Sequence, residues 1–99
     1  YMEAMALSYM PDKIAIYSNS WGPADDGRTM EGPGRVTMTA FEQMIVRGRN
    51  GKGSIYVWAG GNGGAANDNG NYDGYANNRF TIAVGAIAHD GKRAYYSEP

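Results

Sequence analysis

A short apolar run that stops abruptly in glycines limits the folds open to this sequence. The run is Ile55–Ala59, and residues 60–64 after it read Gly-Gly-Asn-Gly-Gly. A run of this length, rich in β-branched and aromatic residues and bounded by glycine, predicts a buried strand. Glycine tolerates positive φ and lets other atoms approach the backbone closely. Asn62 is therefore a candidate for donating hydrogen bonds to a ligand, although an asparagine among glycines is also a common turn residue.

The order of the expected elements indicates an α/β protein with a parallel sheet. We expect helices over residues 1–10 and 34–49, and strands over 14–20, 55–59 and 80–86. An amphipathic helix between two apolar strands is typical of a parallel βαβ unit. Periodicity predicts buried helical faces made of Met2, Met5, Ala6 and Tyr9 in the first helix and of Val36, Ala40, Phe41, Met44 and Ile45 in the second.

Composition excludes several classes of protein. Apolar residues make up 42% of the 99 residues, the net charge is −1, and cysteine is absent. No apolar run reaches the roughly 18 residues of a membrane-spanning helix. We therefore expect no nucleic-acid partner, no membrane contact from this segment and no thiolate or disulfide chemistry. Residues 1–10 lack an N-cap and residues 95–99 bring no closing element, so we expect a piece from the middle of a longer enzyme.

Two polar loops, residues 20–33 and 60–78, follow the carboxyl ends of the first two strands. Ligand sites of open α/β sheets lie at that edge, so the two loops should lie side by side. The acids of the chain gather there, because Asp25, Asp26, Glu31, Asp68 and Asp73 lie in the loops and Glu98 lies near the terminus. Such a cluster favours a cationic ligand or a hard cation bound by oxygen. Aspartate also simply suits turns, so both interpretations stay open at this point.

Two other site types find little support in the sequence. Residues 61–66 fit the dinucleotide pattern G-x-G-x-x-A, but that pattern needs a helix to open at the motif. The Asn-Asp-Asn-Gly-Asn stretch after it is a poor helix former. His89, the single histidine, precedes Asp-Gly and is expected to be an exposed turn residue rather than a metal ligand or a catalytic base.

Four stretches carry a resemblance to a known family. Residues 17–33 read YSNSWGPADDGRTMEGP, residues 53–64 read GSIYVWAGGNGG, residues 73–77 read DGYAN, and residues 96–98 read YSE. They closely resemble the kexin/furin (proprotein convertase) branch of the subtilisin-like serine proteases, in register over essentially the whole chain. The resemblance implies that residues 1–99 are the central part of a peptidase catalytic domain with a parallel-sheet, three-layer subtilisin-like fold.

The resemblance also implies roles for individual residues. Asn62 is similar to the oxyanion-hole asparagine of the family, which stabilises the tetrahedral intermediate of peptide hydrolysis. The residues that match substrate-binding positions are the backbone edge Ser20, Trp21 and Gly22, the pocket acids Asp25 and Asp73, and Glu31, which would meet a second, more distant basic side chain. The residues that match calcium ligands are Asp25, Asp68 and Glu98.

The function implied is calcium-dependent cleavage of peptides or proteins after Lys or Arg, especially paired ones, by a secreted or secretory-pathway enzyme. The alternative is a catalytically inactive relative, or a peptide-binding module that uses the same acidic groove. Gly60 stands where the family usually has serine, Ala24 replaces an acid, and Gly70 and Pro99 stand where animal members have cysteines. The catalytic aspartate, histidine and serine of the family all fall outside the matched region, so we expect the 99 residues alone to be inactive.

Overall fold

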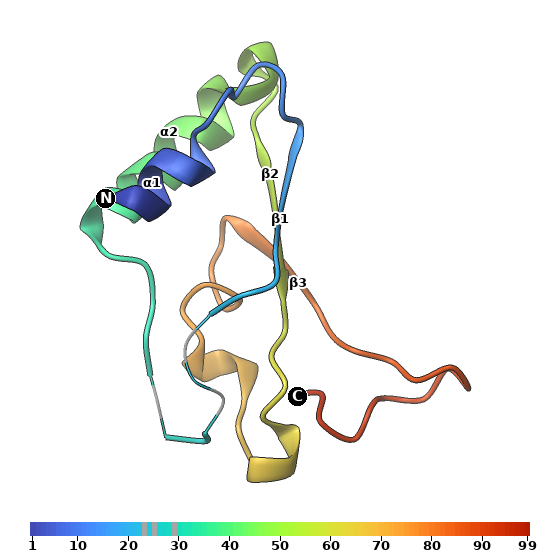
Figure 1. Ribbon diagram of the computed structural model, residues 1–99. Helices are drawn as coiled ribbons and strands as arrows, with labels where there is room; N and C mark the ends of the chain where they lie inside the picture. Colours follow the sequence, from blue (N-terminus) through green and yellow to red (C-terminus); the bar gives the residue numbers. More distant parts are fainter. Residues whose placement is uncertain (23, 25, 29) are drawn as a thin grey trace.

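The chain forms a small parallel sheet with helices packed on one side of it (Figure 1). The computed structural model describes residues 1–22, 24, 26–28 and 30–99. Its elements, in chain order, are α1 (Met2–Leu7), β1 (Ile16–Asn19), α2 (Arg35–Gly51), β2 (Ile55–Ala59) and β3 (Thr81–Val84). The strands lie in the order β1-β2-β3 and both pairings are parallel, which confirms the predicted α/β class and the βαβ unit.

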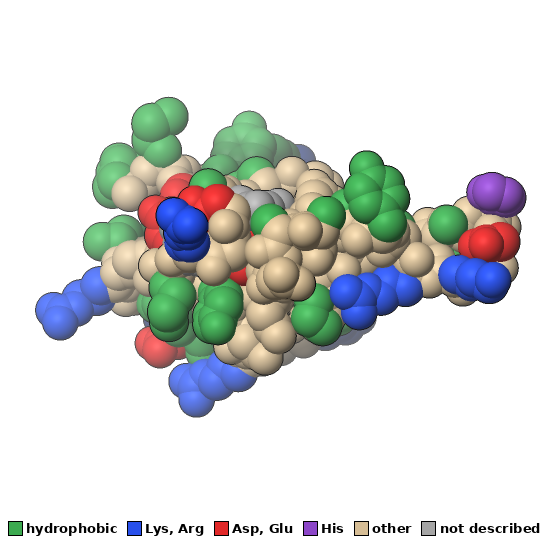
Figure 2. Space-filling model, turned by 90° about the horizontal axis from the view of Figure 1, so that it is seen from below, with side chains coloured by type: hydrophobic (Ala, Val, Ile, Leu, Met, Phe, Trp, Pro, Cys, Tyr) green, Lys and Arg blue, Asp and Glu red, His purple; other side chains and the backbone are tan. Residues whose placement is uncertain are grey.

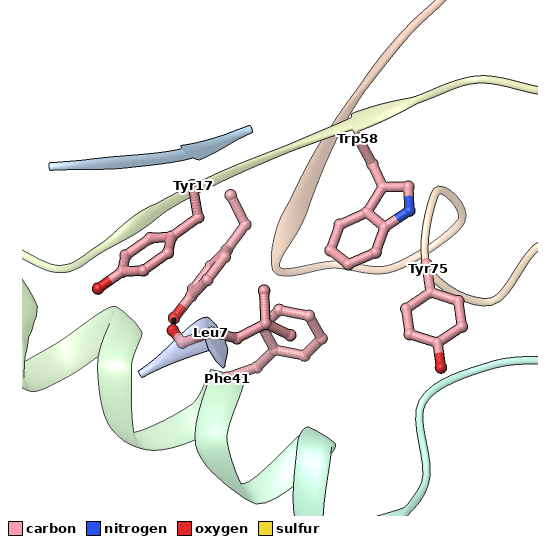
Figure 3. Close-up of a cluster of buried hydrophobic side chains, with 6 residues drawn as sticks. Leu7, Tyr17, Phe41, Trp58 and Tyr75 are labelled. Atoms are coloured by element: carbon pink, nitrogen blue, oxygen red, sulfur yellow. Dashed lines mark hydrogen bonds between the residues drawn. The ribbon is translucent and has the colours of Figure 1, made fainter. Parts of the chain in front are cut away.

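The aromatic core lies between the sheet and the helices (Figure 3). Tyr17 of β1 pairs in register with Tyr56 of β2, and their rings stack with centroids 5.0 Å apart. Phe41 of α2 packs edge-on against Tyr56 and is fully buried. Because side chains alternate along a strand, Tyr56 and Trp58 share this face of β2. The buried cluster as a whole consists of Leu7, Tyr17, Phe41, Tyr56, Trp58 and Tyr75.

The opposite face of the sheet is largely exposed. Ile16 and Ile82 are each 57% exposed and Val84 is 54% exposed. Parallel sheets normally carry a layer on both faces. The described residues therefore form two layers, a sheet and one layer of helices. The structure describes no helix long and apolar enough to cross a membrane.

The first helix is shorter than predicted, and its expected apolar face was wrong. It ends at Leu7, and its buried residues are Ala4 and Leu7. Met2, Met5 and Tyr9 are 82%, 56% and 63% exposed, because so short a helix contacts the core along a single i, i+3 pair. After Leu7 the chain turns back, and Tyr17 donates a hydrogen bond to the carbonyl of Tyr9 at 2.7 Å.

The second helix matches its prediction more closely. Ala40 and Phe41 are buried, and Met44 and Ile45 pack against the core. Val36 is 55% exposed instead of buried. Thr37 is buried in its stead and is only 3% exposed. The buried face of α2 therefore begins one residue later than predicted.

The end of α2 is a left-handed turn. Arg49 and Asn50 have φ of 53° and 56°, so the regular part of the helix stops before them. Their amides donate to the carbonyl of Pro11 and to Oδ1 of Asp12, both at 2.9 Å. Gly53, with φ of 91°, then reverses the chain into β2. Strand β2 has the bounds that were predicted, whereas β1 and β3 are shorter than the expected strands because their ends bend into the loops.

Candidate functional site

The two polar loops, residues 20–33 and 60–78, lie side by side, as the parallel topology predicted. Residues 31 and 73 form a parallel bridge in which the amide of Gly74 donates to the carbonyl of Glu31 at 2.7 Å. The amide of Glu31 donates in turn to the carbonyl of Tyr72 at 3.3 Å. Segments that follow different strands are thus joined at the carboxyl edge of the sheet, where ligand sites of such sheets occur.

Trp21 is anchored to the core through its main chain and its ring. Trp58 donates its indole N–H to the carbonyl of Trp21 at 2.6 Å, and the two rings meet edge-on with centroids 4.8 Å apart. Trp21 also packs edge-on against Tyr75 at 5.0 Å. Ser20 and Gly22 are both exposed.

Asp73 lies directly beside this edge. A Cβ atom on Gly22 would lie 3.0 Å from Oδ2 of Asp73, so the glycine lets the carboxylate approach the backbone closely. The other oxygen, Oδ1, accepts the amides of Tyr75 at 2.8 Å and Ala76 at 3.3 Å. These amides fix the carboxylate and leave Oδ2 at the edge formed by Trp21 and Gly22.

Asp68 and Glu98 converge on Gly63. Glu98 accepts the amide of Gly63 through Oε1 at 2.9 Å. A Cβ atom on Gly63 would lie 2.6 Å from Cβ of Asp68 and 2.9 Å from Oε1 of Glu98. Asp68 is 5% exposed and accepts the amides of Gly27 at 3.0 Å and Asn69 at 2.8 Å. The structure thus brings together two residues that are far apart in the sequence.

The predicted calcium ligands Asp25, Asp68 and Glu98 stay a prediction. Carboxylate oxygens held by main-chain amides are the donor type that calcium binds. The third predicted ligand, Asp25, which is also a predicted pocket acid, lies outside the described residues. Apart from positions 23, 25 and 29, the chain contains no group of three or more His, Cys, Asp or Glu arranged to hold a metal ion. Asp68 and Glu98 fit a calcium site as a pair that needs further oxygen donors.

Asn62 is exposed and lies near the start of the loop that follows β2. Gly61 before it has φ of 95°, which turns the chain sharply at that point. Its neighbour Gly63 is buried against Asp68 and Glu98, so the backbone under Asn62 is held from one side. The motif at 61–66 opens only the three-residue 3-10 turn Gly64–Ala66, so the structure also argues against a dinucleotide site.

One acidic residue was missed by the sequence analysis. Oε2 of Glu3 accepts the hydroxyl of Tyr75 at 2.9 Å and that of Thr37 at 3.4 Å. Glu3 and Glu31 line one open cavity of about 640 Å³ together with Tyr75. Burial first, and then Glu3, raises the pKa of Tyr75, which keeps its hydroxyl protonated as the donor. No motif surrounds Glu3, so only the packing of α1 shows that it reaches this cavity.

His89 is an exposed turn residue, as predicted. The amide of Gly91 closes the turn by donating to the carbonyl of Ala88 at 3.0 Å, and Gly91 has φ of 80°. This turn ends a hairpin that projects from the body of the molecule, with the single histidine at its tip (Figure 2). Nothing in this arrangement gives His89 a role at the carboxyl edge of the sheet.

The parallel sheet with helices on one side defines the chain as an α/β protein, and its carboxyl edge carries an exposed amide and carboxylates held by main-chain amides. The sequence model of the subtilase family matches residues 1–99. Among curated proteins, the chain is 50% identical to proprotein convertase subtilisin/kexin type 4 of Mus musculus, and 48% identical to furin-like protease 1, isoform 1-CRR, of Drosophila melanogaster. The chain belongs to the subtilase family, which confirms the resemblance found in the sequence.

The match covers nearly all of this chain and little of its relatives. Each alignment spans 97 residues, or 98% of this chain. The same residues make up 15% of the mouse protein and 9% of the fly protein. Proprotein convertase subtilisin/kexin type 5 of Rattus norvegicus is 47% identical over 98% of this chain and 5% of its own length.

Proposed function

We propose that this chain is the oxyanion-hole and substrate-pocket segment of a serine endopeptidase of the subtilisin/kexin type, which hydrolyses peptide bonds after basic, and especially paired, residues. The observation that carries the proposal is the Asp73 carboxylate held beside Gly22, at the edge formed by Ser20, Trp21 and Gly22. A negative charge next to the exposed Ser20 and Gly22 suits an extended peptide with a basic side chain. Family membership and the names of the relatives support the same reaction.

Asn62 is the residue proposed to act on the reacting bond. When the nucleophilic serine of such an enzyme attacks a peptide carbonyl, negative charge develops on the carbonyl oxygen. An amide N–H of Asn62 would donate to that oxygen, while the nucleophile and its base come from other parts of the catalytic domain. The 99 residues by themselves would therefore bind peptide without cleaving it.

The second basic residue of the substrate would meet the cavity lined by Glu3 and Glu31. Asp73 and Glu31 are joined through their backbones, so the two acidic sites keep a constant spacing. Fixed spacing between two acids favours a substrate with two basic side chains over one with a single charge, because only the former pairs with both.

Calcium is proposed as a structural ion held by Asp68, Glu98 and Asp25. When bound, it would neutralise the mutual repulsion of these carboxylates and hold the 60–78 loop against the segment of Glu98. It would thus support the backbone below Asn62 without entering the reaction. We further propose that the parent protein works in the secretory pathway, in keeping with the convertase relatives.

The first test uses the full-length protein and a fluorogenic peptide that contains Lys-Arg. Asn62→Ala should lower kcat by about 10²–10³-fold with little change in KM, the range measured when the corresponding amide is removed from subtilisin itself. Asn71→Ala is the matched control, because Asn71 is an exposed asparagine of the same loop whose hydrogen bonds use its main chain. Equal activity of Asn62→Ala and the control would refute the role of Asn62.

The alternative function, a catalytically inactive relative that binds basic peptides, has a distinct outcome. In that case the full-length protein would bind the Lys-Arg peptide and leave it intact, and Asp73→Asn would weaken the binding. The calcium proposal is tested by thermal inactivation with and without a chelator. Asp68→Asn should abolish the difference between the two conditions, and a difference as large as that of the wild type would refute the site.

A further inference from the structure

The segment after β3 folds back onto the loop that carries Asn62. Residues 86–94 form a hairpin in which the amide of Ala94 donates to the carbonyl of Ala86 at 3.2 Å and that of Ala88 to the carbonyl of Lys92 at 2.7 Å. Residues 95–99 then return toward the sheet (Figure 1, red). Arg93 lies at the base of the hairpin, paired across it with Ile87.

The guanidinium of Arg93 holds the returning segment. Its Nε and Nη2 donate to the carbonyl oxygen of Ser97 at 3.1 and 2.7 Å. Ser97 itself is only 3% exposed, and its hydroxyl accepts the amide of Ala86 at 3.3 Å. Two charge-assisted hydrogen bonds to one carbonyl oxygen restrain both the position and the direction of the carbonyl group.

The residues on either side of Ser97 contact the glycines that follow Asn62. The carbonyl of Tyr96 accepts the amide of Gly64 at 2.9 Å, and Oε1 of Glu98 accepts the amide of Gly63 at the same distance. A Cβ atom on Gly64 would lie 3.0 Å from the carbonyl oxygen of Tyr96, so the two backbones are in direct contact. The position of residues 96–98 therefore determines where the backbone of Gly63 and Gly64 lies.

From these contacts we infer that Arg93 is a positioning residue for the Asn62 loop: by holding Ser97, it fixes the two acceptors that hold the amides of Gly63 and Gly64. The inference rests on the proposed function, because it assigns Arg93 to the reaction that Asn62 would serve. Lysine has no planar fork, so it would make one contact with Ser97 where arginine makes two.

The experiment compares Arg93→Ala, Arg93→Lys and Lys92→Ala in the full-length protein. Lys92 is the matched control, since it is the adjacent basic residue and its hydrogen bonds among the described residues use its main chain. Arg93→Ala should lower kcat about tenfold with KM nearly unchanged, Arg93→Lys should restore part of the loss, and Lys92→Ala should match the wild type.

A double-mutant cycle separates positioning from a general loss of stability. If Arg93 acts through Asn62, Arg93→Ala should lower kcat by less than about twofold once Asn62 is already alanine. A full tenfold loss in that background would overturn the inference, and so would a rise in KM with kcat unchanged.

Amide hydrogen exchange tests the contact without requiring activity. Arg93→Ala should speed exchange at Gly63 and Gly64, while the amides of β2 keep their protection. Unchanged exchange at both glycines would overturn the inference. If the wild type fails to cleave the Lys-Arg peptide, the proposed function fails, whereas the exchange measurement still decides whether Arg93 holds the loop.

Discussion

Replacing Trp58 by phenylalanine should loosen the edge formed by Ser20, Trp21 and Gly22, because it removes the hydrogen bond to the Trp21 carbonyl. Trp58 is fully buried, its N–H is the donor to the carbonyl of Trp21, and its ring stacks on Tyr75 with centroids 5.1 Å apart. Leaving the Trp21 carbonyl without its donor costs about 1–3 kcal/mol. The weaker aromatic contacts add about 0.5–1.5 kcal/mol. We therefore expect a loss of about 1.5–4.5 kcal/mol in the free energy of unfolding.

Part of that loss should appear in substrate binding. If about 1 kcal/mol is expressed as misplacement of Ser20 and Gly22, KM for a Lys-Arg peptide rises about fivefold while kcat changes less. The assay is steady-state kinetics of the full-length protein together with its half-life at elevated temperature, because inactivation of large proteins is governed by the unfolding rate.

Phe41→Leu is the matched control for general destabilisation. Phe41 is also fully buried, but it comes from α2, packs edge-on against Tyr56 with centroids 4.8 Å apart, and has no polar atom that could bond the Trp21 carbonyl. It should shorten the thermal half-life with KM unchanged. The reasoning fails if both variants raise KM equally, or if Trp58→Phe changes neither property.

Three further changes have outcomes that follow from the structure. Gly63→Ala places a methyl group 2.6 Å from Cβ of Asp68, so it should separate the carboxylate pair and reduce the thermal protection given by calcium, as measured with and without a chelator. Burial raises the pKa of the Tyr56 hydroxyl from 10 to about 12. The stability that the protonated hydroxyl contributes to the folded state is therefore full below pH 10 and is lost as the pH rises toward 12. Tyr56→Phe should flatten that alkaline decline in chemical denaturation, while lowering stability at neutral pH through the lost hydrogen bond to the Leu7 carbonyl. Gly53→Ala, at φ of 91°, should lower the unfolding free energy by about 1–3 kcal/mol in the same assay, whereas Gly51→Ala, also at positive φ but in open space, should cost less.

Much of the fold was predictable because its signals are local. The run at β2 and the glycines after it gave the correct strand bounds, and the parallel pairing followed from a helix lying between two apolar strands. The face of α1 was not predictable, because a helix of six residues presents few apolar positions and the core selects among them. Thr37 is buried and Val36 is exposed for a similar reason, since the crossing of α2 over the sheet decides which helix positions are covered.

The candidate site divides in the same way. The order of residues along the chain already places an asparagine and several acids after two core strands, and the loops after parallel strands meet at one edge of the sheet. Which of these acids lie together depends on the packing of separate elements. Asp68 and Glu98 converge because the chain returns to Gly63 after β3, and Glu3 reaches Tyr75 across 72 residues because α1 packs beside α2. Contacts of this kind depend on how separate elements pack, and local periodicity carries no information about the distances between them.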